Sequence, residues 1–104
     1  MNICIADLDV VKAELTANEI MKIYKVKANG YKLDVSKSEE IIKIRDKVTQ
    51  DMGSVDILVN NAGLMTFNTF DDQKTEQIEK LLQVNVLGTI LVNSAIKSKI
   101  CFFF

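Results

Sequence analysis

The fold of this chain is decided by the stretch Asp56-Ile57-Leu58-Val59-Asn60-Asn61-Ala62-Gly63. Its first half is a short apolar run, which predicts a strand over 56–59 that is buried on both faces, as in a parallel sheet. The run stops at two amides, which cost free energy when they are buried without partners. Gly63 can take a positive φ and lets another molecule approach the backbone. In open α/β sheets the ligand crevice lies beyond the carboxyl ends of the strands, so we expect a ligand to meet the polar half of this stretch.

Strands and helices alternate on both sides of this stretch. The predicted strands are 3–6, 31–35 and 56–59, and the predicted helices are 10–24, 36–52 and about 74–97. Asn29-Gly30 separates the first helix from the second strand, the second helix opens at a capping-box sequence, and Gly53 ends it. The order β-α-β-α-β-α predicts an α/β fold with three parallel strands and three helices, joined by right-handed crossovers.

Length and composition limit the chain to one small domain. It has 104 residues, of which 48% are hydrophobic and 26% are charged, as in a globular protein. We expect this domain over 1–97, followed by an apolar tail over 98–104 with no turn or polar partner after it. The tail resembles read-through into unrelated sequence, so a truncated isoform or an incomplete gene model is the simplest account.

Charge and cysteine usage exclude several classes of function. The net charge of −1, from 13 basic and 14 acidic residues, gives no electrostatic case for nucleic acid or an anionic membrane surface. For Cys4 and Cys101 we favour two buried free thiols in a reducing, cytoplasmic compartment over a disulfide. Two cysteines and no histidine leave no zinc site and no histidine-based catalysis. The sequence also lacks an apolar run long enough for a membrane span, and its start does not resemble a signal peptide.

Two acidic residues follow predicted strands, and each admits two interpretations. Asp7 could accept hydrogen bonds from the ribose hydroxyls of an adenine dinucleotide, or it could be a helix N-cap, as could Asp9. Asp34 could bond the exocyclic amine of an adenine, or it could start the turn at Ser36. Taken alone, each residue is better explained by its local structural role.

Asn85 is more informative because it lies on the apolar face of the third predicted helix. That face also contains Ile78, Leu81, Gly88 and Val92. An amide buried there without a partner costs ~1–3 kcal/mol. Asn85 is therefore either a satisfied amide that bonds the backbone of a neighbouring element, or a group that loosens the helix and holds a water near a ligand. Gly88, one turn later, permits this helix to pack closely, at a propensity cost of ~1 kcal/mol relative to alanine.

These signals together are much more specific. An apolar strand ending in Asn-Asn-Ala-Gly, then a loop, then a helix carrying Gln83-Val84-Asn85-Val86-Leu87-Gly88, resembles the short-chain dehydrogenase/reductase family, classical type. The resemblance runs from Ile3 to about Ala95 and implies a partial Rossmann-like three-layer sandwich that binds NAD(P). The stretch 56–88 is most similar to animal members that act on hydroxysteroids, retinoids or related lipid alcohols, which implies a role in lipid metabolism. For full-length relatives it implies association with the endoplasmic reticulum or lipid droplets.

The resemblance also implies roles for individual residues. Asp7 falls where the family places the acid that selects the nucleotide, and Asp34-Val35 falls where it contacts the adenine. Asn60-Asn61-Ala62-Gly63 matches the motif that stabilises the sheet and lines the cofactor. Asn85 matches the helix asparagine of the catalytic tetrad. Asp7 would repel a 2′-phosphate, which favours NAD over NADP, although Lys12 leaves NADP open.

Other parts of the family pattern are missing. A TGxxxGxG turn normally holds the pyrophosphate, but the four glycines Gly30, Gly53, Gly63 and Gly88 are widely spaced. The serine and the YxxxK pair of the tetrad are absent, because Tyr24 and Tyr31 both lie upstream and neither is followed by lysine four residues on. The chain would supply the second, third and fourth strands of the family sheet without the first, so it looks truncated at both ends.

Three hypotheses follow, the first two of them from what the family resemblance implies. The first is a part of an NAD(P)-dependent alcohol dehydrogenase or carbonyl reductase that binds NAD weakly, if at all, and is inactive alone. The second is a non-catalytic interaction fragment that forms a homo- or heterodimer through the third helix. The third is a flavodoxin-like phospho-receiver, which uses Asp7, Asp9 and Asp34 but leaves Asn60 to Gly63 unexplained, and which ranks last.

Overall fold

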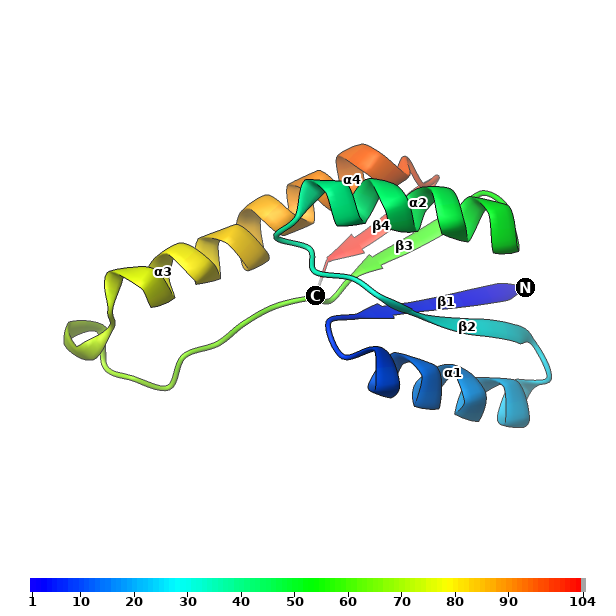
Figure 1. Cartoon of the computed structure of the whole chain (residues 1–104), viewed down its shortest axis with the longest axis horizontal. Coiled ribbons are helices and arrows are strands. Elements are labelled where there is room, and N and C mark those ends of the chain that lie inside the picture. Colours follow the sequence, from blue (N-terminus) through cyan, green and yellow to red (C-terminus); the bar gives the residue numbers. More distant parts are fainter. Residues whose placement is uncertain (104) are drawn as a thin grey trace. The chain divides into compact units, whose positions relative to one another are not determined.

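The computed structural model describes residues 1–103 and divides into two compact units (Figure 1). The first unit contains Met1–Asp34 and Glu39–Ser54, and the second contains Val35–Ser38 and the chain from Val55 onward. Each unit contains one pair of parallel strands: β1 with β2, and β3 with β4. The α/β class and the parallel pairing are therefore confirmed, but the described residues form four strands in two sheets rather than the predicted three.

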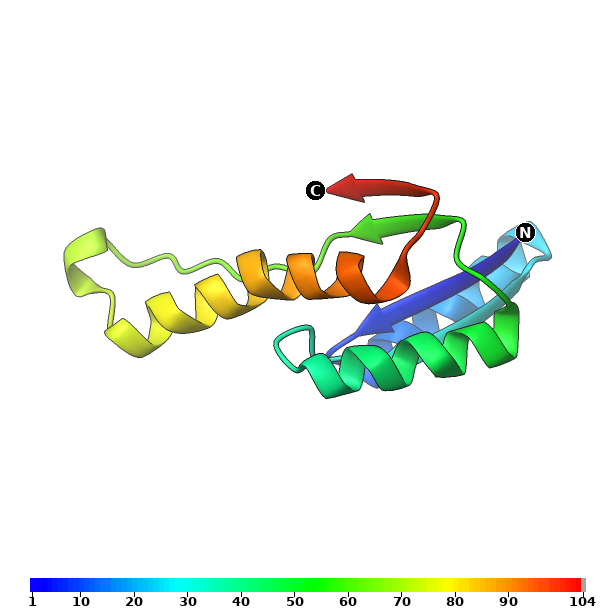
Figure 2. The ribbon, with the colours of Figure 1, turned by 90° about the horizontal axis from the view of Figure 1, so that it is seen from above.

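In the first unit, two helices enclose a two-stranded sheet. The elements are β1 (Asn2–Asp7), α1 (Val10–Tyr24), β2 (Lys27–Lys32) and α2 (Ser38–Met52). The two helices lie on opposite faces of the strands (Figures 1 and 2). Helix α1 begins where the Asp9 carboxylate accepts hydrogen bonds from the backbone N–H groups of Val11 and Lys12. Helix α2 is followed by Gly53 at φ 91°, which confirms the predicted stop.

Gly30 brings α1 unusually close to the sheet. A Cβ atom at this position would lie 2.4 Å from the backbone nitrogen of Glu14 and 2.6 Å from the carbonyl carbon of Ala13. The contacting helix face is made of small residues, since Ala13 and Ala17 are buried. The predicted break at Asn29-Gly30 and the predicted strand over 31–35 are thus wrong: β2 starts earlier and ends at Lys32, and Gly30 is a packing position inside it.

In the second unit, a long helical segment connects two parallel strands. Its elements are β3 (Ile57–Asn60), a 3-10 turn (Phe70–Asp72), α3 (Thr75–Leu82), a π-helical segment (Gln83–Gly88), α4 (Thr89–Ile96) and β4 (Ile100–Phe103). Figure 2 shows the loop after β3 running out to the start of α3 and the helical segment returning to the strands. The β3–β4 register runs from Ile57↔Ile100 to Asn60↔Phe103. Residues 100–103 of the predicted apolar tail are therefore a strand, because they pair with β3, and Phe104 lies outside the described residues.

Burial in this unit also differs from the prediction. Ile57 and Val59 are 55% and 54% exposed, so β3 is covered on one face only, where Leu58 is half-buried. Helix α4 contacts β3, and its Val92 is buried. The expectation of a strand buried on both faces was wrong, because an apolar run does not reveal how many layers cover it.

A polar cluster joins the end of α2 to the sheet of the first unit. The buried Tyr31 hydroxyl donates to Asp51 Oδ2 at 3.0 Å and accepts from Asn29 Nδ2 at 3.2 Å. Burial is the main cause that raises the pKa of Tyr31 above its ordinary value. Partial desolvation of the nearby Cys4 thiol also raises its pKa, and the negative charge of Asp51 adds to this. Both cysteines are free thiols, but Cys4 is exposed and Cys101 half-buried rather than fully buried, because each lies on a strand of a two-stranded sheet.

This cluster predicts a loss of stability at alkaline pH. The folded chain holds the Tyr31 and Cys4 protons more tightly than the unfolded chain, so their contribution is complete below the ordinary thiol pKa of 9.0. It is lost as pH rises through the two raised pKa values. Urea unfolding should give a lower free energy of unfolding at pH 10.5 than at pH 8, and Tyr31→Phe should make this difference smaller. Tyr24→Phe, at an exposed tyrosine of α1, is the matched control, and an equal effect of both substitutions would contradict the assignment.

Candidate functional site

A depression of about 330 Å³ lies at the carboxyl end of β3, within the second unit. Its lining residues are Asn60, Ala62, Gly63, Asn85, Thr89 and Phe103. Two segments far apart in sequence thus meet there: the polar half of the Asp56–Gly63 stretch and the π-helical segment with the start of α4. This is the place where a ligand crevice was expected from the strand direction.

Asn85 attaches the helix to the loop that leaves β3. Its Oδ1 accepts from the backbone N–H of Leu64 at 2.7 Å, and its Nδ2 donates to the Leu64 carbonyl oxygen at 2.9 Å. These two bonds are those expected of an amide that bonds the backbone of a neighbouring element, the first of the two interpretations of Asn85. Asn85 is exposed, however, rather than inward-facing. The backbone around it is π-helical, so the spacing of a regular α-helix does not predict which way its side chain faces.

The π-helical segment also changes how backbone groups are satisfied beside the depression. The Thr89 hydroxyl donates to the carbonyl oxygen of Asn85 at 3.0 Å. A single helix over 74–97 was predicted, and the helical range Thr75–Ile96 agrees with it apart from this widened turn. The widened turn contains Asn85, which bonds the loop after β3. π-Helical turns of this kind are frequent at functional sites.

A chain of side-chain hydrogen bonds lies behind Asn60. Asn60 Nδ2 donates to Cys101 Sγ at 3.1 Å, and the Cys101 thiol donates to Asn93 Oδ1 at 2.7 Å. Asn93 Nδ2 in turn donates to the carbonyl oxygen of Thr89 at 2.9 Å. Thr89 and Asn93 were not predicted as site residues, although both follow Asn85 at steps of four along the helix, which would place them on one face. Cys101 carried no such signal.

Two glycines of the second unit serve different purposes. A Cβ atom at Gly88 would lie 2.8 Å from Val35 Cγ2 and 3.0 Å from the Val35 carbonyl oxygen, so Gly88 permits close packing, as predicted. A Cβ atom at Gly63 would meet only Asn85 Oδ1, at 3.6 Å. The positive φ that Gly63 could adopt is not used, since Gly53 is the only glycine with positive φ among the described residues. Packing within the chain thus does not require a glycine at 63.

The remaining candidate residues are distributed over both units. Asp7 ends β1 in the first unit, and its Oδ1 accepts from the Asp9 N–H at 2.8 Å, so Asp9 rather than Asp7 is the N-cap. Asp34 is half-buried and lies two residues beyond β2, with its backbone N–H donating to Glu40 Oε2 at 3.0 Å. Val35 contacts the Gly88 region, and Asn61 is exposed beside the depression.

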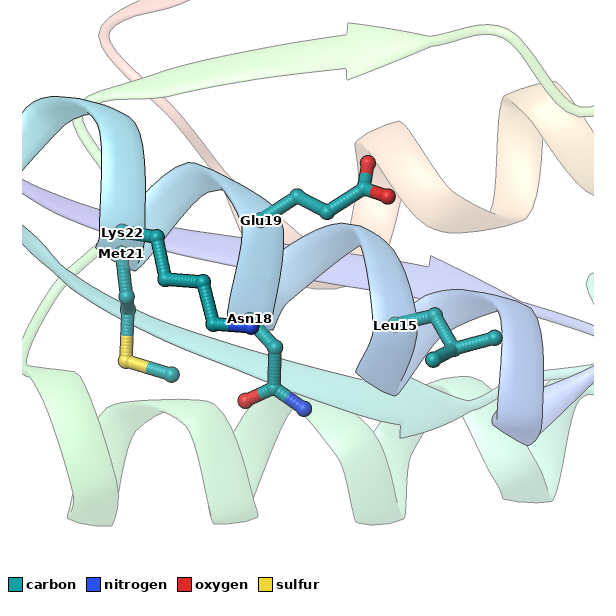
Figure 3. Close-up of a pocket in the computed structure, with 5 residues that line it drawn as sticks. All are labelled: Leu15, Asn18, Glu19, Met21 and Lys22. Atoms are coloured by element: carbon teal, nitrogen blue, oxygen red, sulfur yellow. The ribbon is translucent and has the colours of Figure 1, made fainter.

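A second depression, of about 540 Å³, lies along α1 (Figure 3). It is lined by Leu15, Asn18, Glu19, Met21 and Lys22. All five come from one helix of the first unit, and Figure 3 shows their side chains spread along it without converging on a common point. The arrangement offers no paired groups for chemistry.

Residues 1–103 contain neither a cluster of metal ligands nor a helix that could span a membrane. Within this range no three His, Cys, Asp or Glu side chains come together as metal ligands would. None of the helices in the same range is long and apolar enough to cross a membrane.

The family model described as short chain dehydrogenase matches residues 1–100. The chain belongs to the short-chain dehydrogenase family. The match includes Ile100, the first residue of β4. The family resemblance read from Asn60–Gly63 and Asn85 is confirmed.

Curated relatives cover most of this chain but are much longer than it. The oxidoreductase YuxG of Bacillus subtilis is 39% identical over 89 residues, which are 85% of this chain and 13% of the relative. Human 17-beta-hydroxysteroid dehydrogenase 13 is 36% identical over 90 residues, which are 86% of this chain and 30% of the relative. The chain therefore spans less than a third of either of these short-chain dehydrogenases.

Solved structures show the same relation. An alcohol dehydrogenase of Thermococcus sibiricus, complexed with 5-hydroxy-NADP, is 31% identical with a TM-score of 0.84. The matched region is 90% of this chain and 40% of the dehydrogenase chain. An oxidoreductase of Haemophilus influenza with bound NAD is 30% identical with a TM-score of 0.81. The matched region is 92% of this chain and 40% of the oxidoreductase chain. Relatives with this fold thus bind NAD or an NADP derivative.

Proposed function

We propose that this chain is the cofactor-lining part of an NAD(P)-dependent oxidoreductase whose complete form transfers a hydride between the dinucleotide and an alcohol or carbonyl carbon. The observation that carries this is the depression at the carboxyl end of β3, where Gly63 contributes no side chain and Asn85 fixes the adjoining loop. Relatives of the same fold hold dinucleotides, which supports the same ligand class here.

Each candidate residue has a proposed role toward the dinucleotide. Asn61, Ala62 and Gly63 line it, with the missing side chain of Gly63 leaving room for a close backbone approach. Asp34 and Val35 contact the adenine. The Asp7 carboxylate accepts from ribose hydroxyls and repels a 2′-phosphate, which favours NAD over NADP.

Asn85 is the tetrad residue present, and the sequence has no YxxxK pair to supply a general acid and its activating lysine. We therefore propose that this chain alone does not turn over substrate. The substrate class of the complete enzyme is a lipid alcohol such as a hydroxysteroid or retinoid, a proposal supported by the similarity to 17-beta-hydroxysteroid dehydrogenase 13.

Binding of NAD by the chain tests the cofactor role. Titration of isotope-labelled chain should shift the backbone amide resonances of Asn61, Ala62 and Gly63, with a Kd of roughly 1 mM. Gly63→Ala should weaken binding about tenfold, since the added methyl occupies the approach path, while stability stays within ~0.5 kcal/mol.

Three outcomes bear on this proposal. Shifts that spread evenly over the chain, or none at these three amides, would overturn the cofactor role. Tighter binding of NADP than of NAD would overturn the role of Asp7. Alcohol-dependent NADH formation by the purified chain would overturn its proposed inactivity.

A second candidate function, dimer formation, is favoured by one observation. Leu82, Val86 and Ile90 follow one another at steps of four along the helical segment and are 56%, 52% and 58% exposed. An exposed apolar stripe of this kind suits a partner helix, either in a second copy or in a longer relative.

This surface predicts an association that a single charge would weaken. Val86→Glu, at the centre of the stripe, should lower the association constant at least tenfold in sedimentation equilibrium. Gln83→Glu adds the same charge at an exposed polar position nearby and should change it little. A wild-type chain that stays monomeric at high concentration would rule out the homodimer, and failure to co-purify with a longer relative would rule out the heterodimer.

A further inference from the structure

The hydrogen-bond chain behind Asn60 has a direction that a single backbone atom decides. The Thr89 carbonyl oxygen can only accept, so the Asn93 amide must present Nδ2 to it. Asn93 Oδ1 then faces Cys101 and can only accept, so the Cys101 thiol must donate. The sulfur is left to accept from Asn60, which must therefore present Nδ2 rather than Oδ1. The hydrogen bonds thus fix which atom is nitrogen and which is oxygen in both the Asn93 and the Asn60 amides.

This chain ends at the candidate site. Asn60 is the last residue of β3 and lines the depression. Cys101, on β4, pairs with Leu58 of β3 and is therefore a diagonal neighbour of Asn60. Both residues are half-buried, so their contact is partly shielded from water. Asn93 belongs to α4, the helix that covers this face of the strands. Cys101 therefore links that helix to the amide in the depression.

We propose that Cys101 is a positioning residue: acting with Asn93, it holds the Asn60 amide in one orientation at the base of the depression. This rests on the proposed cofactor role of that depression. Cys101 itself contacts no ligand and undergoes no chemistry. A preset amide binds a ligand without first giving up rotational freedom, so its loss weakens binding more than it weakens the fold.

Three substitutions at one position separate hydrogen bonding from packing. Cys101→Ser keeps a hydrogen-bond donor and acceptor. Cys101→Val fills the space but can neither donate nor accept, and Cys101→Ala removes both the hydrogen bonding and the packing. The side-chain amide resonances of Asn60 report its orientation directly, and NAD titration reports binding. Cys4→Ser, at the exposed thiol of the first unit, is the matched control.

We expect Cys101→Ser to keep both readouts close to wild type. Cys101→Val and Cys101→Ala should shift and broaden the Asn60 side-chain resonances and weaken NAD binding about fivefold. Asn93→Asp should do the same, because a carboxylate cannot donate to the Thr89 carbonyl. Unchanged Asn60 resonances in Cys101→Val would overturn the proposal. If wild-type chain binds neither NAD nor NADP, the proposed function fails, but the Asn60 resonances still decide whether Cys101 positions the amide.

Discussion

Gly30→Ala should lower the free energy of unfolding of the first unit by about 3 kcal/mol, at the upper end of the usual cost of overpacking. The added methyl would lie 2.4 Å from Glu14 N and 2.7 Å from Glu14 Cα, which are backbone atoms and cannot rotate away. Relief requires α1 to move off the sheet, which would open the contact made by Ala13 and Ala17. In a small domain of marginal stability, such a loss leaves a measurable unfolded population.

Tyrosine fluorescence during urea unfolding measures this effect, because both tyrosines of the chain, Tyr24 and Tyr31, lie in the first unit. Lys32→Ala, at an exposed position of the same strand, is the matched control and should change stability by less than ~0.5 kcal/mol. Gly63→Ala carries the same chemical change to a glycine with an open surrounding and should leave this transition unmoved. A Gly30→Ala chain as stable as wild type would show that α1 does not approach β2 as closely as described.

Local patterns predicted the elements that depend on local chemistry. The apolar run before Asn60 is a strand, the carboxylate before Val10 starts a helix, and Gly53 ends one with positive φ. Each of these follows from a few neighbouring residues and their backbone preferences. The long helix was predicted within two residues at either end for the same reason, since its apolar repeat continues over many turns.

Features that depend on distant partners could not be predicted in the same way. Gly30 reads as a turn residue unless the approach of α1 is known, and 100–103 reads as a loose tail unless β3 is placed beside it. The π-helical segment changed the direction of Asn85, because one widened turn breaks the spacing on which the prediction relied. At the site, Asn60, Gly63 and Asn85 were expected, but Cys101 enters only through strand pairing.

Asn85→Leu should release the loop that follows β3 and abolish measurable NAD binding. Both hydrogen bonds to the Leu64 backbone are lost, and each contributes about 1 kcal/mol or less at this exposed position. Protection of the Leu64 amide against hydrogen exchange should therefore fall about tenfold, since ~1.4 kcal/mol corresponds to that factor. Asn85→Asp keeps the bond from the Leu64 N–H but places an oxygen against the Leu64 carbonyl, so its effect should be intermediate.

The exchange measurement decides the matter even if binding of NAD is too weak to measure. Asn18→Leu makes the same change at an exposed amide of α1 and should leave Leu64 protection unaltered. Equal protection of Leu64 in wild type and in Asn85→Leu would show that Asn85 does not hold the loop. Lost protection with retained NAD binding would show that the loop is attached by Asn85 but that its attachment is not needed for the cofactor. Loss of both, with α1 and β2 unperturbed, is the result that links the π-helical turn to the Asn60–Gly63 wall of the site.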